Sequence, residues 1–169
     1  MRHTLNFRGN KSTKAVLLLL LVCSSVVVAP LSSAGASTKK KSVSYFTLHP
    51  CALIPRAEVE SLFAGAPMSP GQASPSAFGG SCAYTTTGTN AAANLNYAFN
   101  AGSAKSVRKY VEKPLTAEKS VGHNAYCSGN GGLYADAGNL KGAPENLNIA
   151  AGNCAADVKF AKAAFTHLS

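Results

Sequence analysis

The sequence predicts a single α+β domain in which a mostly antiparallel sheet of about five strands is flanked by three helices. Residues 92–100 alternate strictly, with Leu95, Tyr97 and Phe99 on one face and small or polar residues on the other. This period of two is typical of a strand with one buried and one solvated face. Segments with helical spacing lie before, between and after the other strand segments. The expected order is helix, two strands, helix, three strands, helix.

Residues 1–36 have the pattern of a secretory signal peptide: a basic start without acidic residues, an apolar run, and a small-x-small exit. Cleavage is predicted after Ala36. The alternative is a retained membrane anchor. A helix that spans a bilayer needs roughly 20 apolar residues, however, and here Pro30 and several polar residues interrupt the apolar run. A lipoprotein signal needs a small residue before the modified cysteine, whereas Val22 precedes Cys23. Lipidation is therefore not expected.

Residues 37–50 have little pattern and are predicted to be a flexible leader. Its lysines, Lys39, Lys40 and Lys41, could contact anionic wall polymers or a membrane surface. The whole chain is basic, with 16 Lys and Arg against 7 Asp and Glu. Four of those basic residues precede Ala36, however, and three more are these lysines. Because no basic stripe interleaved with aromatic residues remains, nucleic-acid binding is not expected.

Four cysteines remain in the domain, which is expected to span residues 51–169. An even number of cysteines in an exported chain indicates a disulfide frame. Three pairings are possible, and the sequential one is preferred: Cys51–Cys82 and Cys127–Cys154. Each would close a loop of about 30 residues, worth roughly 3–4 kcal/mol of stability.

The first helix is predicted within residues 52–67. Pro55 suits the first helical turn, and Glu58 lies near the positive end of the helix dipole. Gly65 and then Pro67 end the helix.

The second and third helices are predicted over residues 101–114, with Ser103 as the cap, and over 153–169, with Asn153 as the cap. The residues expected to face the core have helical spacing: Val59, Leu62 and Phe63 in the first helix, Val107, Tyr110 and Val111 in the second, and Val158, Ala161, Phe165 and Leu168 in the third.

The other strands are predicted from β-favouring residues between turn signals. Residues 81–87 contain Tyr84 and three threonines, and a glycine-rich turn joins strands at 125–128 and 133–137. The last strand is expected at 147–152. Residues 68–80 and 139–146 are predicted loops, since both are rich in Gly, Pro and polar residues.

One phrase resembles a known family. "CALIPRAEVESLF", beginning at Cys51, followed by "SCAY" at residues 81–84, is similar to the Cys-x-Leu-Leu…Glu-Val…Leu-Leu-Gly and Cys-x-Tyr phrases of exported actinobacterial proteins and lipoproteins of unknown function. "VGHNAY", at 121–126, resembles that family's Gly-x-x-Ala-Tyr segment. Extracellular sensor domains of some mycobacterial receptor kinases are similar in outline. The resemblance covers residues 51–168 and implies an envelope location and a sheet-and-helix domain, but no catalytic residues. Many relatives carry a lipobox, which this chain lacks.

The candidate binding residues are four tyrosines on predicted strands: Tyr84, Tyr97, Tyr126 and Tyr134. Packing in the core or on the sheet is the main interpretation. The alternative is a ligand groove beneath the helix at 101–114, where aromatic rings would line an apolar pocket. The absence of tryptophan argues mildly against a platform for stacking sugars.

No catalytic set, metal site or cofactor is expected. His49, His123 and His167 lack the spacing of zinc ligands. Residues 79–83, "GGSCA", lack the closing glycine of a nucleophile elbow. The predicted function is an exported, non-enzymatic binding or sensor-like module of the cell envelope, whose ligand or partner is unknown. The alternative is a small secreted hydrolase with an unrecognised site.

Overall fold

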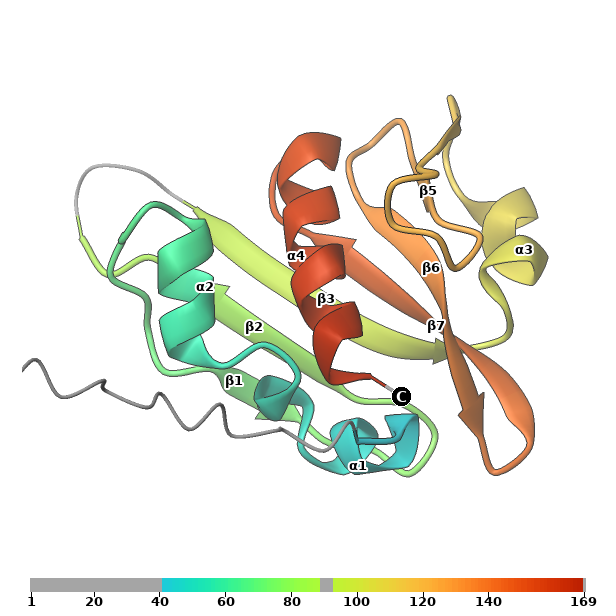
Figure 1. Ribbon diagram of the computed structural model, residues 1–169, viewed down its shortest axis with the longest axis horizontal. Helices are drawn as coiled ribbons and strands as arrows, with labels where there is room; N and C mark the ends of the chain where they lie inside the picture. Colours follow the sequence, from blue (N-terminus) through green and yellow to red (C-terminus); the bar gives the residue numbers. More distant parts are fainter. Residues whose placement is uncertain (1–40, 89–92, 169) are drawn as a thin grey trace, which may run out of the picture. The chain divides into compact units, whose positions relative to one another are not determined.

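A computed structural model describes residues 41–88 and 93–168 and confirms an α+β fold with an antiparallel sheet (Figure 1). Within these residues the sheet has seven strands instead of five, and there are four α-helices instead of three. The strands are β1 Gln72–Ser74, β2 Ser81–Thr85, β3 Asn94–Ala101, β4 Thr116–Ala117, β5 Tyr126–Cys127, β6 Leu133–Leu140 and β7 Ala143–Ala150. The helices are α1 Val43–Leu48, α2 Arg56–Leu62, α3 Ala104–Val107 and α4 Cys154–His167, with 3₁₀ turns η1 Pro50–Ala52 and η2 Arg108–Tyr110.

The strands lie in the order β1-β2-β3-β7-β6-β5-β4, and every neighbouring pair is antiparallel. The last strand of the chain, β7, pairs with β3 in the middle of the sheet. The pairing of β3 with β7 therefore joins the first half of the domain to the second, where β6 and β7 form a hairpin. The sheet has two short edge strands, β1 and β4.

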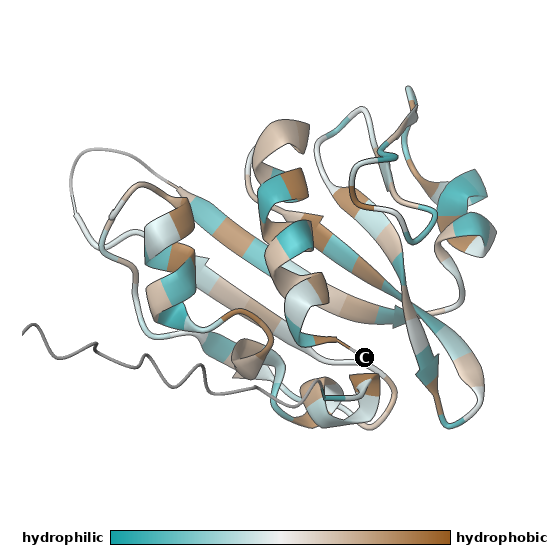
Figure 2. Ribbon diagram, in the orientation of Figure 1, coloured by the Kyte–Doolittle hydropathy of each residue, from teal (hydrophilic) through white to brown (hydrophobic). Residues whose placement is uncertain are grey.

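One face of the sheet carries the hydrophobic core. The alternation predicted for 92–100 is present in β3, where Leu95, Tyr97 and Phe99 are buried while Asn94 and Asn96 are exposed. Figure 2 shows this alternation as bands along the strands. Helix α4 packs on β6 and β7 over the apolar face, and α2 lies beside it (Figure 1). The residues on the opposite face of β2 and β3 are small or polar, and they are exposed or partly exposed.

Helix α4 covers the sheet largely with small residues. Its cap is as predicted: the side chain of Asn153 accepts a hydrogen bond from the backbone N–H of Ala156 at 3.0 Å. Of the predicted inward stripe, Ala161 and Leu168 are buried, and Val158 and Phe165 are partly buried. The largest buried side chain of the helix is Phe160, which the stripe omitted. The helical surface in contact with the sheet is thus broader than one narrow stripe.

The described part of the predicted leader is ordered, so the expectation of flexibility is wrong from residue 43 onward. Val43 and Phe46, three positions apart on α1, are both 2% exposed. Such spacing places two apolar side chains on one helical face. Lys41 is exposed, with its ammonium 3.9 Å from the ring centroid of Tyr45. The signal peptide, its cleavage after Ala36, and Lys39 and Lys40 lie outside the described residues.

Both predicted loops contain strands. Residues 68–80 include β1, and 139–146 form the turn of a β6–β7 hairpin. The polar composition of the second segment suggested a loop because Pro144, Glu145 and Asn146 are poor strand formers. Pairing with β6 and β3 outweighs that local preference. Lys141 and Gly142, both with positive φ, make the turn.

The second helix is much shorter than predicted. Ser103 is the cap, accepting a hydrogen bond from the Ser106 N–H at 3.1 Å, but the α-helix ends at Val107 and continues only as η2. The prediction that Tyr110 faces the core is wrong, because its side chain is 79% exposed. Three residues of 3₁₀ helix advance by about 120° each instead of 100°, which shifts the helical face.

Two disulfides form in the sequential pairing preferred above. Cys51–Cys82 joins η1 to β2, and Cys127–Cys154 joins β5 to the first residue of α4. Such bonds are typical of proteins that mature in an oxidising, extracytoplasmic environment. None of the helices in the described ranges is long and apolar enough to cross a bilayer.

Glu145 in the hairpin is an isolated buried carboxylate. Its side chain is 3% exposed, and its Oε2 accepts no hydrogen bond from the described residues. Burial raises the pKa of this carboxyl group above its ordinary value. Folding therefore favours the protonated form, and the stability of the domain falls as the pH rises from the ordinary pKa through the raised one.

Replacing Glu145 with glutamine is expected to stabilise the domain at pH 7 by about 1 kcal/mol, because a neutral amide costs less to bury than a charge. The gain should disappear below about pH 4, where the wild-type carboxyl group is protonated in both states. Urea denaturation at both pH values measures the difference. Glu112→Gln, at an exposed site, is the control. A Glu145→Gln variant that is less stable than wild type at pH 7 would contradict this account.

Candidate functional site

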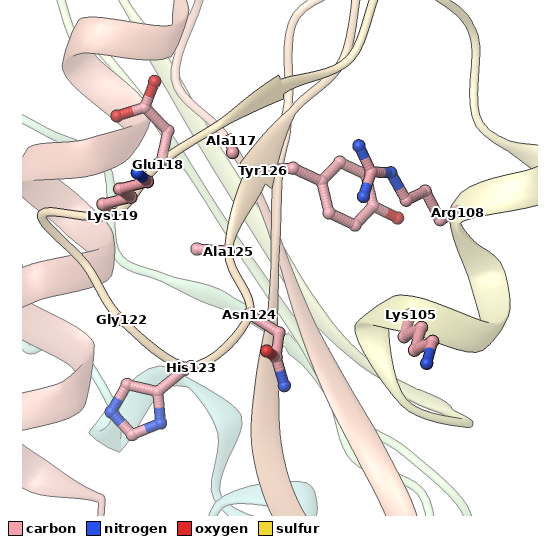
Figure 3. Close-up of a pocket in the computed structure, with 10 residues that line it drawn as sticks. All are labelled: Lys105, Arg108, Ala117, Glu118, Lys119, Gly122, His123, Asn124, Ala125 and Tyr126. Carbon is pink, nitrogen blue, oxygen red and sulfur yellow. The ribbon is translucent and has the colours of Figure 1, made fainter.

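A cavity of about 540 Å³ lies between α3 and the segment 117–126 (Figure 3). One wall is made by Lys105 of α3 and Arg108 of η2. The other wall comes from the strand β4, the connection to β5, and β5 itself. The residues that line this wall are Ala117, Glu118, Lys119, Gly122, His123, Asn124, Ala125 and Tyr126. The lining therefore contains three cationic side chains and one carboxylate. The cations are Lys105, Arg108 and Lys119, and the carboxylate is Glu118.

A left-handed turn forms the lower part of the second wall. Gly122, His123 and Asn124 have φ values of 74°, 54° and 52°, and the N–H of Ala125 donates to the carbonyl of Gly122 at 2.9 Å. Residues other than glycine adopt this conformation infrequently and at some energetic cost. Such conformations cluster at ligand-binding and catalytic sites. The His123 ring stacks on Phe165 of α4 at a centroid distance of 4.0 Å, which fixes the turn against the helix.

Asp136 of β6 connects the two walls. One carboxylate oxygen accepts a hydrogen bond from the backbone N–H of Ala104 at 2.6 Å, and the other accepts from the side-chain amide of Asn124 at 2.6 Å. Hydrogen bonds to a carboxylate are short and strong. The β-bulge after Asp136 allows β6 to present this side chain while continuing its pairing with β7. Asp136 therefore ties the two walls together.

Tyr126 forms the floor between the walls. Its hydroxyl donates to the carbonyl of Ala104 at 3.2 Å, and its ring stacks on Tyr134 with centroids 5.4 Å apart. The guanidinium of Arg108 lies 5.5 Å from the Tyr126 ring centroid, within the range of a cation–π contact. Figure 3 shows Arg108 against this ring. Burial, with a smaller contribution from Tyr134, raises the pKa of the Tyr126 hydroxyl, which therefore stays protonated at neutral pH.

A second hollow of about 600 Å³ adjoins the cavity and shares Lys105 and Arg108 with it. Lys109, Lys113 and Leu115 complete its lining. The salt bridges of the described residues join Arg56 to Glu60 and His167 to Glu58. None of these four residues lines either hollow. The cations of both hollows are thus available to a ligand.

The structure separates the four predicted tyrosines into two pairs. Tyr84 and Tyr97 are buried in the core, where their hydroxyls donate to backbone carbonyls of residues 50–54. Tyr126 and Tyr134 lie beside α3, and Tyr126 lines the cavity, while the ligand groove itself stays a prediction. Sequence reasoning missed the cations, Asn124 and Asp136. The signal for the cations was the basic cluster at residues 105–113, but basic residues on a predicted helix most often form its solvated side.

One cluster has the residue types of a metal site. The Glu118 carboxylate and the sulfur atoms of Cys127 and Cys154 lie within 4.8 Å of one another. The two sulfurs are bonded together as a disulfide, whereas zinc requires deprotonated thiols. The oxidised cluster is consequently structural.

Two residues of types used in acid–base catalysis lie elsewhere in the fold. Ser81 of the "GGSCA" segment lies on β2, and the His167 ring pairs with the Glu58 carboxylate at 3.0 Å. The cavity instead combines cations, an aromatic floor and a rigid turn. These are features of anion recognition. The chain matches no protein-family model, no curated protein and no solved structure.

Proposed function

We propose that this chain is an exported, non-enzymatic binding module of the cell envelope whose ligand is an anion held in the cavity beside α3. The observation that carries the proposal is that Lys105, Arg108 and Lys119 all line one hollow, and that none of them forms a salt bridge with another described residue. Three cations against the single lining carboxylate of Glu118 leave a positive potential in a concave site. Such a site concentrates anions.

The side chains suit carboxylate or phosphate groups. A guanidinium presents a planar fork of N–H donors that binds two oxygens of one anion, and lysine adds a mobile point charge. Stacking against Tyr126 limits the freedom of Arg108 before the ligand arrives. A preorganised donor loses less entropy on binding.

The location in the envelope is supported by the two disulfides and by the signal-like pattern of residues 1–36. The resemblance of residues 51–168 to exported actinobacterial proteins agrees with it. Contacts of Lys39, Lys40 and Lys41 with wall polymers or a membrane surface belong to the same proposal, since they would hold the domain near anionic partners.

Replacing Lys105 and Arg108 together by alanine should weaken the binding of inorganic phosphate and of monomeric galacturonate by about tenfold or more, because charge-assisted hydrogen bonds are lost. NMR chemical-shift titration of the residue 37–169 chain measures these weak affinities. Wild-type binding should also decrease with added salt.

The matched control is Lys159→Ala with Lys162→Ala, which removes two exposed cations from α4 and leaves the cavity intact. This variant should bind within about twofold of wild type. Equal losses in the two double variants would indicate a response to net charge and would refute a specific site.

A further inference from the structure

Two of the three large apolar side chains that are exposed in the described part of the chain lie close to α1. Phe78, in the loop between β1 and β2, is 80% exposed, and Leu48, the last residue of α1, is 55% exposed. The loop is held against the helix, because the N–H of Ser76 donates to the carbonyl of Thr47 at 3.0 Å. At Gly80 the loop passes so close that a Cβ would collide with the same carbonyl oxygen. The two exposed apolar side chains therefore belong to neighbouring segments, both at the lower edge of the view in Figure 1.

Two lysines flank these apolar side chains. The ammonium of Lys141 lies 5.6 Å from the ring centroid of Phe78, within the range of a cation–π contact. Lys41 lies just before α1, with its ammonium against the ring of Tyr45. Tyr45 and Leu48 are three positions apart, so they share the face of α1 that points away from its buried residues. Lys41, Leu48, Phe78 and Lys141 together form the α1 surface.

Lys141 occupies a position that local preference does not favour. It is the first of the two turn residues of the β6–β7 hairpin, and its φ is 50°. A turn with positive φ at both central residues favours Asn-Gly or Asp-Gly, because other residues with a Cβ adopt this conformation at a cost. Residues that contradict local preference are expected at functional or strained sites. The lysine therefore has a reason to be there other than turn formation.

The α1 surface is basic, and the segments that form it contain no acidic residue. Residues 41–57, 67–80 and 137–144 have neither Asp nor Glu. Glu145, which follows the hairpin turn, is buried, and the carboxylate of Glu58 is paired with His167. Lys39 and Lys40 directly precede Lys41 in the sequence and add to the positive charge. Exposed apolar side chains beside uncompensated lysines are typical of proteins that bind the surface of an anionic membrane.

We infer that the α1 surface docks on the headgroups of an anionic lipid membrane. Phe78 and Leu48 enter the interface between headgroups and acyl chains, and Lys41 and Lys141 contact the lipid phosphates. A wall polymer would match the lysines but would leave the two apolar side chains in water. This inference rests on the envelope location in the proposed function. It narrows the partner of the lysine leader to lipid, and it does not depend on the anion cavity.

The first test is co-sedimentation of the residue 37–169 chain with vesicles. Phosphatidylcholine vesicles with about one-third phosphatidylglycerol should bind at least tenfold more tightly than vesicles of phosphatidylcholine alone. Leu48→Ala with Phe78→Ala should weaken binding to the anionic vesicles by about tenfold, and Lys41→Ala with Lys141→Ala by a similar factor. Tyr110→Ala is the matched control, because this ring is also exposed and has a lysine ammonium 4.8 Å from its centroid. It should bind within about twofold of wild type.

The second test uses fluorescence. The chain contains no tryptophan, so a single introduced indole reports only its own environment. The emission of Phe78→Trp should shift to shorter wavelengths when anionic vesicles are added, because the ring leaves water. Tyr110→Trp should show no shift. Equal shifts at the two positions, or no shift at Phe78→Trp, would contradict the insertion of this side chain.

The remaining outcomes separate lipid docking from other partners and from the anion cavity. The inference is overturned if soluble poly-glutamate binds as tightly as the anionic vesicles and the Leu48→Ala with Phe78→Ala variant binds both like wild type. It is also overturned if sedimentation equilibrium shows a dimer that this variant dissociates. If Lys105→Ala with Arg108→Ala abolishes vesicle binding while the Leu48 and Phe78 variant retains it, the headgroup binds in the cavity, and only the proposed function survives. If the Lys105 and Arg108 variant binds inorganic phosphate like wild type, the proposed anion site fails and lipid docking is unaffected. Near-wild-type thermal unfolding of each variant confirms that it is folded.

Discussion

Replacing Cys127 and Cys154 together by alanine should lower the free energy of unfolding by about 3 kcal/mol. The bond closes a loop with a sequence separation of 27, and in the chain-entropy model most of its effect comes from restricting the unfolded chain. A domain of ordinary stability has only about 5–15 kcal/mol in total, so the variant should unfold at a much lower urea concentration. Urea denaturation followed by circular dichroism measures the loss.

This disulfide also lies behind the cavity. It joins β5, which contains Tyr126, to the first residue of α4, and the Glu118 carboxylate is 3.5 Å from the Cys154 sulfur. Its loss should therefore increase hydrogen exchange in residues 117–126 and weaken phosphate binding.

The other disulfide provides the matched control. Cys51→Ala with Cys82→Ala opens a loop of similar sequence separation, 31, at the opposite side of the sheet. It should cost a similar free energy of unfolding but leave phosphate affinity unchanged at temperatures where both variants are folded. If the Cys127 and Cys154 variant unfolds at the wild-type urea concentration, the structural role assigned to this bond is wrong.

The elements with clear periodicity were predictable from the sequence. The alternation in β3 and the capped α4 both follow from local patterns that tertiary packing reinforces. Helix α1 was missed because its two buried apolar residues, Val43 and Phe46, are too few to reveal a period. The strand formed by Pro144, Glu145 and Asn146 was missed because pairing on both sides, with β3 and β6, overrides weak propensity.

The candidate site was less predictable because its parts are distant in sequence. Lys105 and Arg108 line the same hollow as Lys119 because Asp136 and Tyr126 hold the start of α3 against the segment 117–126. No local pattern contains that information.

Replacing Tyr97 with alanine should cost about 3–5 kcal/mol, the range for removing a large aromatic side chain from a core. Tyr97 is 2% exposed on β3. Its hydroxyl donates to the carbonyl of Pro50 at 2.9 Å and accepts from the N–H of Ile54 at 3.4 Å. The substitution would therefore leave a void and also release the segment that leads from η1 into α2.

Two further variants separate these contributions in the same urea experiment. Tyr97→Phe keeps the ring but leaves the Pro50 carbonyl and the Ile54 N–H without their partner, so it should cost about 1–2 kcal/mol. Tyr110→Ala removes the same side chain from a position that is 79% exposed and should change stability by no more than about 0.5 kcal/mol. The expected order of unfolding midpoints is thus Tyr110→Ala above Tyr97→Phe above Tyr97→Ala. Equal midpoints for the two alanine variants would mean that Tyr97 does not anchor η1 to the sheet, and the burial of this ring would need another explanation.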